Sequence, residues 1–172
     1  MPQYHSQGKF PHKRHTVYRK SDGNLYAEEL VSSEGFANVY SLIYHCYPPT
    51  MIKHVGASYS VEPKVVSQRH LNHESFIGFN IAPEADYLQS RKHILVNNDL
   101  NICLAAPQQS LKDYFYKNAD SDEVIFVHIG SGTLKTIYGN LDFGYGDYLV
   151  IPRGTIYQIE FKDADNRLVI VE

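Results

Sequence analysis

Short runs of β-favouring residues, separated by turn residues, follow one another through the second half of the chain. They recur at roughly the 8–12-residue spacing that is typical of a β-sandwich or barrel. Aromatic residues fit a pleated, half-buried surface, and the chain has fourteen tyrosines but no tryptophan. No stretch has the apolar repeat of a useful amphipathic helix. The predicted fold class is therefore all-β, with a jelly-roll barrel as the architecture. Strands are expected at residues 74–81, 93–96, 100–106, 114–117, 123–129, 133–138, 141–143, 148–151, 155–161 and 167–171.

One of these runs has the pattern of an inner strand. Residues 124–129 are apolar or nearly so on both alternating faces, which predicts burial on two sides. The sequence Gly130-Ser131-Gly132 follows and can supply the positive φ angles of a tight hairpin. Gly144 and Gly146 flank another expected reversal.

The remainder of the chain divides at a turn signal. Residues 1–24 are polar and end in Ser-Asp-Gly-Asn, which predicts an extended amino-terminal arm. Two early strands are expected within residues 25–47, and a long connection at 50–72. The predicted organisation is an arm at 1–24 and a barrel domain at 25–172. Because the last residues still read as a strand, we expect that more chain once followed.

Composition excludes several classes of partner. The formal net charge is −3, so the chain has no overall positive field to attract nucleic acid or anionic lipid. The one basic concentration, at 9–20, falls in the arm and is interpreted as a solvated or subunit-packing segment, with an anion contact as the alternative. No signal peptide and no apolar run of roughly 20 residues is present, which predicts a soluble, cytoplasmic protein. Cys46 and Cys103 match neither a zinc ribbon nor a disulfide framework, and reduced thiols are expected.

Motifs for other chemistries are absent or weak. The chain has no G-x-S-x-G elbow and no phosphate-binding loop, which excludes the common hydrolase and nucleotide-binding patterns. His70 and His73 precede Glu74, but residues three apart do not share a face in a strand or loop. His128 lies in the inner strand, where a hydrogen-bonded core histidine is the favoured interpretation over a metal ligand.

Two segments, 118–132 and 146–157, resemble the pair of motifs by which cupin barrels hold a metal. On this comparison, the paired histidines fall at Asp120 and Asp122, the carboxylate falls near Phe126 or Val127, and the last histidine falls at Tyr157.

Iron(II) of the oxygenase type takes two imidazoles and one carboxylate, and none of these imidazoles is present. We therefore expect a degenerate cupin site at Asp120, Asp122 and Tyr157, an interior that has become a packed core, and no metal ligand in this chain. A calcium site made of Asp120, Asp122 and Glu123 is the alternative.

An ordered set of segments resembles the amino-terminal half of homogentisate 1,2-dioxygenase. The set comprises residues 8–16, 25–30, 44–50 and 122–132, and the resemblance covers essentially the whole chain in order. It implies a two-cupin parent enzyme that opens the ring of homogentisate with dioxygen, giving maleylacetoacetate in tyrosine and phenylalanine catabolism.

The same resemblance implies that iron(II) and the catalytic residues belong to the missing carboxyl-terminal half, so no catalytic residue is expected here. It also implies a homo-oligomer of trimers that pair into hexamers. The rival hypothesis is a stand-alone, non-catalytic cupin that binds a small ligand or a protein partner through its barrel mouth.

Overall fold

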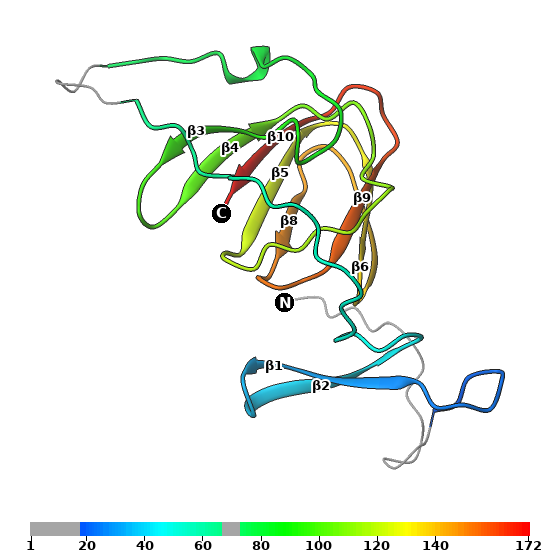
Figure 1. Ribbon diagram of the computed structural model, residues 1–172. Coiled ribbons are helices and arrows are strands. Elements are labelled where there is room, and N and C mark those ends of the chain that lie inside the picture. The colour runs from blue at the N-terminus through cyan, green and yellow to red at the C-terminus, as the bar shows by residue number, and fades with distance from the viewer. Residues whose placement is uncertain (1–17, 67–72) are drawn as a thin grey trace, which may run out of the picture. The chain divides into compact units, whose positions relative to one another are not determined.

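The computed structural model describes residues 18–66 and 73–172 (Figure 1). The chain divides into two compact units, residues 1–60 and 61–172. In this division, residues 25–60 group with the first unit, whereas the sequence analysis places them in the barrel domain. Most of the predicted arm lies outside the described residues, so its extended conformation stays a prediction. In the part of the chain that the structure describes, no helix has the length and apolarity needed to cross a bilayer.

The first unit contains the two early strands, and they form an antiparallel hairpin. Strand β1 (Ala27–Glu34) pairs with β2 (Ala37–His45), and Gly35 at the turn has a φ of 60°. The turn signal before β1 is also confirmed, since the Gly23 amide donates to the Lys20 carbonyl at 3.0 Å and Gly23 has a φ of 84°. Local sequence therefore fixes this unit: two β-favouring runs are joined by a turn that a glycine permits.

The second unit is built on a five-stranded antiparallel sheet. Its strand order is β3-β4-β10-β5-β8, so the strands on either side of β10 are far from it in sequence. The run that was predicted to be an inner strand is β5, which pairs with both β10 and β8. The bounds are β3 (Lys92–Val96), β4 (Asn101–Ala105), β5 (Glu123–Ile129), β8 (Tyr148–Ile151) and β10 (Arg167–Val171).

A three-stranded sheet, β7-β6-β9, provides the other wall of this unit. Its strands are β6 (Gly132–Thr136), β7 (Gly139–Phe143) and β9 (Tyr157–Phe161). Alternate residues from both sheets are buried in one core, which includes Ile125 and Ile170 from the larger sheet and Leu134 and Ile159 from the smaller. Two antiparallel sheets that share one core make the all-β, cupin-like jelly roll that the sequence predicts.

Three local predictions are wrong. Residues 74–81 contain a short 3-10 helix, η1 (Gly78–Asn80), instead of a strand, and residues 114–117 contribute only an isolated bridge from Tyr116 to Tyr157. The glycines at 130 and 132 do not close a hairpin. Strand β5 does not pair with β6, because Gly130 and Ser131 carry the chain from one sheet to the other. Gly130 has a φ of 107°, and a Cβ there would lie 2.2 Å from Asn166 Oδ1, so both conformation and space require glycine.

Candidate functional site

A capped turn before β3 places two large polar side chains, Tyr87 and Arg91, in the barrel interior. The Asp86 carboxylate accepts hydrogen bonds from the amides of Leu88 and Gln89 at 3.0 and 2.9 Å. An aspartate that binds backbone amides two and three residues ahead stabilises such a turn locally. The turn buries Tyr87 completely and leaves the Arg91 side chain 9% exposed. Arg91 therefore places a cation inside the barrel, which requires partners of opposite charge.

Glu123 is the main partner of this cation. It is the first residue of β5 and is fully buried, on the same face as Ile125 and Val127. Its Oε1 accepts a hydrogen bond from Arg91 Nη1 at 2.9 Å, and its Oε2 accepts one from the Tyr157 hydroxyl at 2.6 Å. The Tyr87 hydroxyl also donates to Glu123 Oε1, at 3.4 Å. A buried carboxylate is thus compensated by one cation and two phenols.

Arg91 also faces a second carboxylate. Its Nη2 lies 2.7 Å from Glu172 Oε2, although it is not aligned as a hydrogen-bond donor. Asn118 Nδ2 donates to the same oxygen at 2.9 Å, while Glu172 Oε1 lies 3.8 Å from His93 Nε2. The interior therefore holds one guanidinium between two carboxylates, with an imidazole beside the outer one.

Burial keeps the phenols of this network protonated. It raises the pKa of Tyr116 to about 12, with the Glu123 charge adding to the effect. The pKa values of Tyr87 and Tyr157 are also raised, in both cases mainly by burial. The rings pack edge to face, with centroids 5.5 Å apart for Tyr116 and Tyr157. Tyr87 and Tyr157 therefore act as hydrogen-bond donors to Glu123, and Tyr116 packs against Tyr157.

Of the three predicted cupin-site residues, the structure brings only Tyr157 into the interior. Asp120 and Asp122 are exposed at the entrance to β5. The amide of Asp120 donates to Asn118 Oδ1 at 3.0 Å, and Asp122 Oδ1 accepts a hydrogen bond from the Arg153 amide at 2.7 Å. The two aspartates therefore belong to a surface turn and do not join Tyr157 in the interior.

The inward carboxylate also differs from the prediction. It is Glu123, whereas the motif comparison put it near Phe126 or Val127. Since successive strand residues point to opposite faces, Glu123 lies inside while Asp122 lies outside. Asp122 and Glu123 therefore do not converge, and the alternative calcium site has no basis in the geometry.

The histidines singled out in the sequence do not form a site together. His70 lies outside the described residues, and His73 is exposed. His128 is half-buried on the outer face of β5, where its ring stacks on Phe79 with centroids 4.0 Å apart and planes 9° from parallel. The predicted core role of His128 is thus replaced by stacking against η1.

The residues at the barrel centre do not fit an oxygenase iron. That ion needs two imidazoles and a carboxylate with open positions. The central carboxylate, Glu123, is instead engaged by Arg91 and Tyr157. No imidazole lies among the partners of Glu123 in residues 18–66 and 73–172. The arrangement is a structural ion-pair network.

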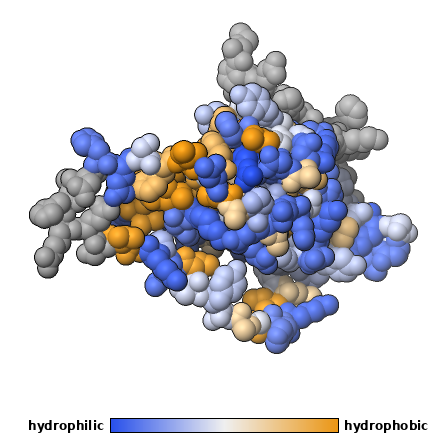
Figure 2. Space-filling view, turned by 90° about the horizontal axis from the view of Figure 1, so that it is seen from above, coloured by the Kyte–Doolittle hydropathy of each residue, from blue (hydrophilic) through white to orange (hydrophobic). Residues whose placement is uncertain are grey.

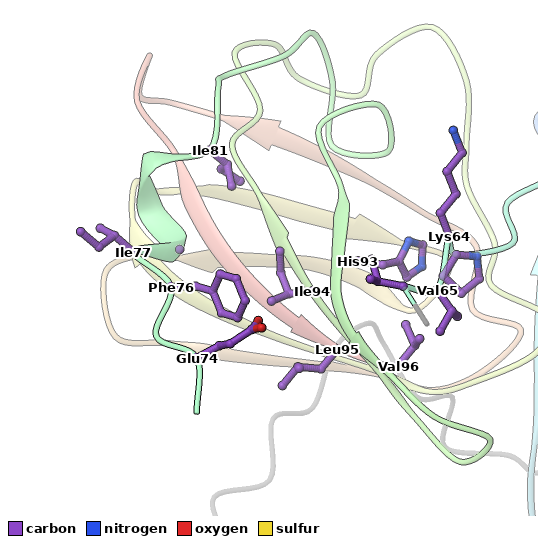
Figure 3. A pocket seen from close by; sticks show the side chains of 13 residues that line it. Lys64, Val65, Glu74, Phe76, Ile77, Ile81, His93, Ile94, Leu95 and Val96 are labelled. Atoms are coloured by element: carbon purple, nitrogen blue, oxygen red, sulfur yellow. The ribbon is translucent and has the colours of Figure 1, made fainter. Parts of the chain in front are cut away.

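A separate groove, of about 800 Å³, opens beside β3. In Figure 3 the side chains of Phe76, Ile94 and Leu95 line it, with Lys64 and His93 at one end. Figure 2 shows hydrophobic residues gathered on one side of the surface when the molecule is seen from above. The groove is mainly apolar and has no cluster of catalytic groups among the residues described.

The two cysteines should differ sharply in reactivity. Cys46 is exposed, whereas Cys103 is buried, and burial raises the pKa of the Cys103 thiol to about 11. The thiolate is the reactive form. In the presence of a chelator at pH 8, we expect a chromogenic disulfide reagent to titrate one thiol in the native chain and two in guanidinium chloride. Rapid reaction of both thiols in the native chain would contradict this prediction.

Fold and interior together define a class: a jelly-roll domain whose interior holds a buried ion-pair network. The family model described as the homogentisate 1,2-dioxygenase N-terminal domain matches residues 5–172, and the chain belongs to this family. It is 37% identical over 169 residues to a candidate dioxygenase of Saccharolobus solfataricus. That match covers 98% of this chain but 44% of the relative, so the chain spans less than half of the relative's length.

Solved structures resemble part of the chain. A cupin-2 domain protein from Shewanella frigidimarina is 25% identical, with 48% of this chain and 78% of that chain covered and a TM-score of 0.42. KdgF from Halomonas is 16% identical, with 47% of this chain and 74% of that chain covered and a TM-score of 0.43.

Proposed function

We propose that this chain forms the amino-terminal structural half of a homogentisate 1,2-dioxygenase. The whole enzyme opens the aromatic ring of homogentisate with dioxygen and gives maleylacetoacetate, a step in tyrosine and phenylalanine catabolism. The observation that carries the proposal is the family match, which runs over residues 5–172. The relationship to a dioxygenase of more than twice this length supports it.

In this proposal the chain supplies scaffold and no ligand to the catalytic iron(II). The central carboxylate supports this role, because Glu123 is already neutralised by Arg91 and bound by Tyr157. The phenols are held protonated by burial and cannot serve as bases near neutral pH. Catalytic iron and substrate then belong to residues outside these 172.

Exposed hydrophobic side chains support a role as one part of a larger assembly. On β8, Tyr148 and Val150 are 67% and 66% exposed, on the face opposite the buried Leu149 and Ile151. Apolar surface of this kind is typical of sites that other protein covers. We propose that the rest of the enzyme and neighbouring subunits, in a cytoplasmic trimer or hexamer, cover it.

An oxygen electrode tests the proposal. The complete product of the native reading frame, loaded with iron(II), is expected to consume dioxygen when homogentisate is added, and the same product treated with a chelator serves as the control. The 172-residue chain, given the same iron, is expected to consume none. Ring cleavage by the 172-residue chain alone, or no uptake by the complete product, would refute the proposal.

The rival function, a stand-alone cupin that binds a small ligand or a protein, predicts a different result. In that case, an intact mass measured on protein from the native source would equal that of the 172-residue chain. A larger mass together with homogentisate-dependent oxygen uptake would reject it.

A further inference from the structure

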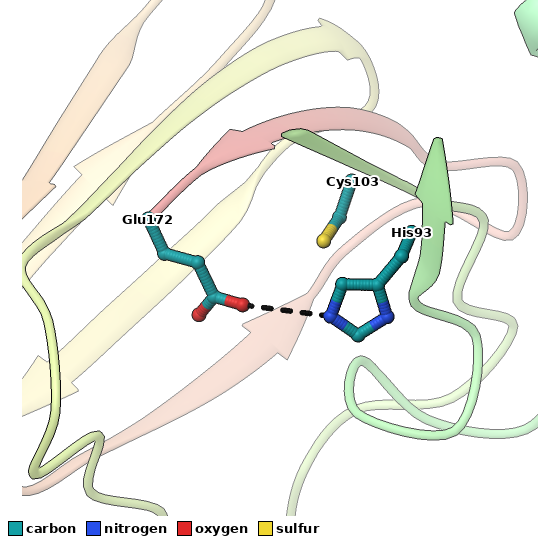
Figure 4. Close-up of side chains that lie close together, drawn as sticks. All are labelled: His93, Cys103 and Glu172. Atoms are coloured by element: carbon teal, nitrogen blue, oxygen red, sulfur yellow. Dashed lines mark ion pairs between the residues drawn. The ribbon is translucent and has the colours of Figure 1, made fainter. Parts of the chain in front are cut away.

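Three side chains with metal-binding atoms lie close together on or beside neighbouring strands of the larger sheet, next to the Arg91 network. His93 on β3 lies directly opposite Cys103 on β4, and Glu172 follows β10, the next strand in the sheet. One ligand atom from each residue can be chosen so that all three lie within 4.8 Å of one another. Figure 4 shows the three side chains turned toward a common point.

These separations are close to those of a tetrahedral metal centre. Ligand atoms bound to zinc at roughly 2.0–2.3 Å lie about 3.5 Å from one another. His93 Nε2 and Glu172 Oε1 are already 3.8 Å apart, and the three ligand atoms lie within 4.8 Å of one another, so side-chain rotation would bring them to the separation of a bound site. We propose that His93 Nε2, Cys103 Sγ and Glu172 Oε1 form a three-ligand site for one Zn²⁺ ion, with water in the fourth position.

The donor types favour zinc over harder cations. A mixed nitrogen, sulfur and oxygen set suits Zn²⁺, whereas calcium and magnesium take oxygen ligands. With one imidazole, the set also differs from the two-imidazole triad of oxygenase iron. The site is therefore distinct from the catalytic iron in the proposed function, and an ion bound there would contradict the expectation that this chain holds no metal ligand.

Neighbouring groups orient the carboxylate for this role. Glu172 Oε2 is held by Asn118 Nδ2 at 2.9 Å and lies 2.7 Å from Arg91 Nη2, which leaves Oε1 directed at His93. Outer-sphere contacts of this kind fix a metal ligand and tune its affinity. The side chains of His93 and Glu172 are 28% and 12% exposed, so an ion can reach the ligands from this side.

Charge balance also favours a dication. One guanidinium, Arg91, faces two carboxylates, Glu123 and Glu172, which leaves one excess negative charge when both are ionised. When Zn²⁺ binds, the Cys103 thiol loses its proton to solvent as the sulfur–zinc bond forms. The dication then balances the thiolate and the excess carboxylate charge, and the enclosed cluster becomes neutral.

Cobalt(II) provides a direct spectroscopic test, because thiolate coordination gives an intense near-ultraviolet charge-transfer band. The 172-residue chain without a histidine tag is expected to bind one Co²⁺ with this band, and Zn²⁺ is expected to displace it. Cys103→Ser should abolish the band. His93→Gln, on an edge strand, should weaken Co²⁺ binding by about 100-fold or more while the chain remains folded. Cys46→Ser, the matched control at the exposed cysteine, should leave both band and affinity unchanged.

Several outcomes would overturn the site. They are the absence of a thiolate band in the unchanged chain, a band that survives Cys103→Ser, and a band that is lost in Cys46→Ser. Cobalt binding with a nitrogen-only spectrum would place the ion at other histidines and would also reject the proposal. The measurement uses neither homogentisate nor dioxygen, so its result is independent of the test of the proposed function.

Discussion

Replacing Glu123 by alanine is expected to lower the free energy of unfolding by about 3–5 kcal/mol, because it removes one partner from a buried ion pair. Arg91 loses its hydrogen-bonded carboxylate, and the hydroxyl of Tyr157 loses its acceptor. Urea denaturation followed by far-ultraviolet circular dichroism measures the change. Tyrosine fluorescence gives a second probe, since the chain has no tryptophan.

The matched control is Glu160→Ala, which removes an ion pair of a different kind. Glu160 pairs with Lys135 at 2.5 Å, but both side chains are more than one third exposed. Exposed pairs contribute little because water and salt screen them. The control should therefore leave the urea midpoint close to that of the unchanged chain. Equal midpoints for the two variants would mean that the interior network does not stabilise the barrel.

Gly132→Ala is expected to destabilise the barrel by about 3 kcal/mol, the upper part of the usual range for overpacking. A Cβ at this position would lie 2.3 Å from the Glu160 carbonyl oxygen and 2.6 Å from Phe143 Cζ. The carbonyl belongs to β9, which is paired with β6, so it cannot move without disturbing the three-stranded sheet. Thermal unfolding and urea denaturation both measure the effect.

Gly144→Ala is the control for this change. A Cβ at Gly144 would meet nothing within 4 Å, and its φ is outside the positive range that disfavours other residues. A change within about 0.5 kcal/mol is expected, as for an ordinary surface substitution. If Gly132→Ala were as stable as Gly144→Ala, the close approach of β6 and β9 in the structure would be wrong.

Local pattern was enough to predict most of the strands. The runs at 123–129, 148–151 and 167–171 coincide with β5, β8 and β10, because their alternation and apolar content are local properties. The same reasoning gives a wrong prediction for residues 74–81. Their apolar side chains suggested a strand, but η1 packs there against the sheet, with Phe79 stacked on His128.

Sequence reasoning predicts much less of the interior site around Glu123. The spacing of glycine and proline predicts the motif position of Tyr157, but spacing alone does not reveal that Asp120 and Asp122 lie in a surface turn. The burial of Glu123 could have been predicted from the sequence, because Glu123 shares a strand face with Ile125 and Val127. Arg91 had no such signal. It meets Glu123 from 32 residues away, through a turn whose position in space only the fold determines.

The buried network around Glu123 also affects how cooperatively the barrel unfolds. It joins a loop residue, Arg91, to the start of β5 and to Tyr157 in the opposite sheet. If any of these segments moved away, a charge or a hydroxyl would be left without a partner in an apolar interior. Partial opening of the barrel is therefore unfavourable. The amides of β5 and β9 should consequently exchange with deuterium together, in one cooperative event, rather than strand by strand.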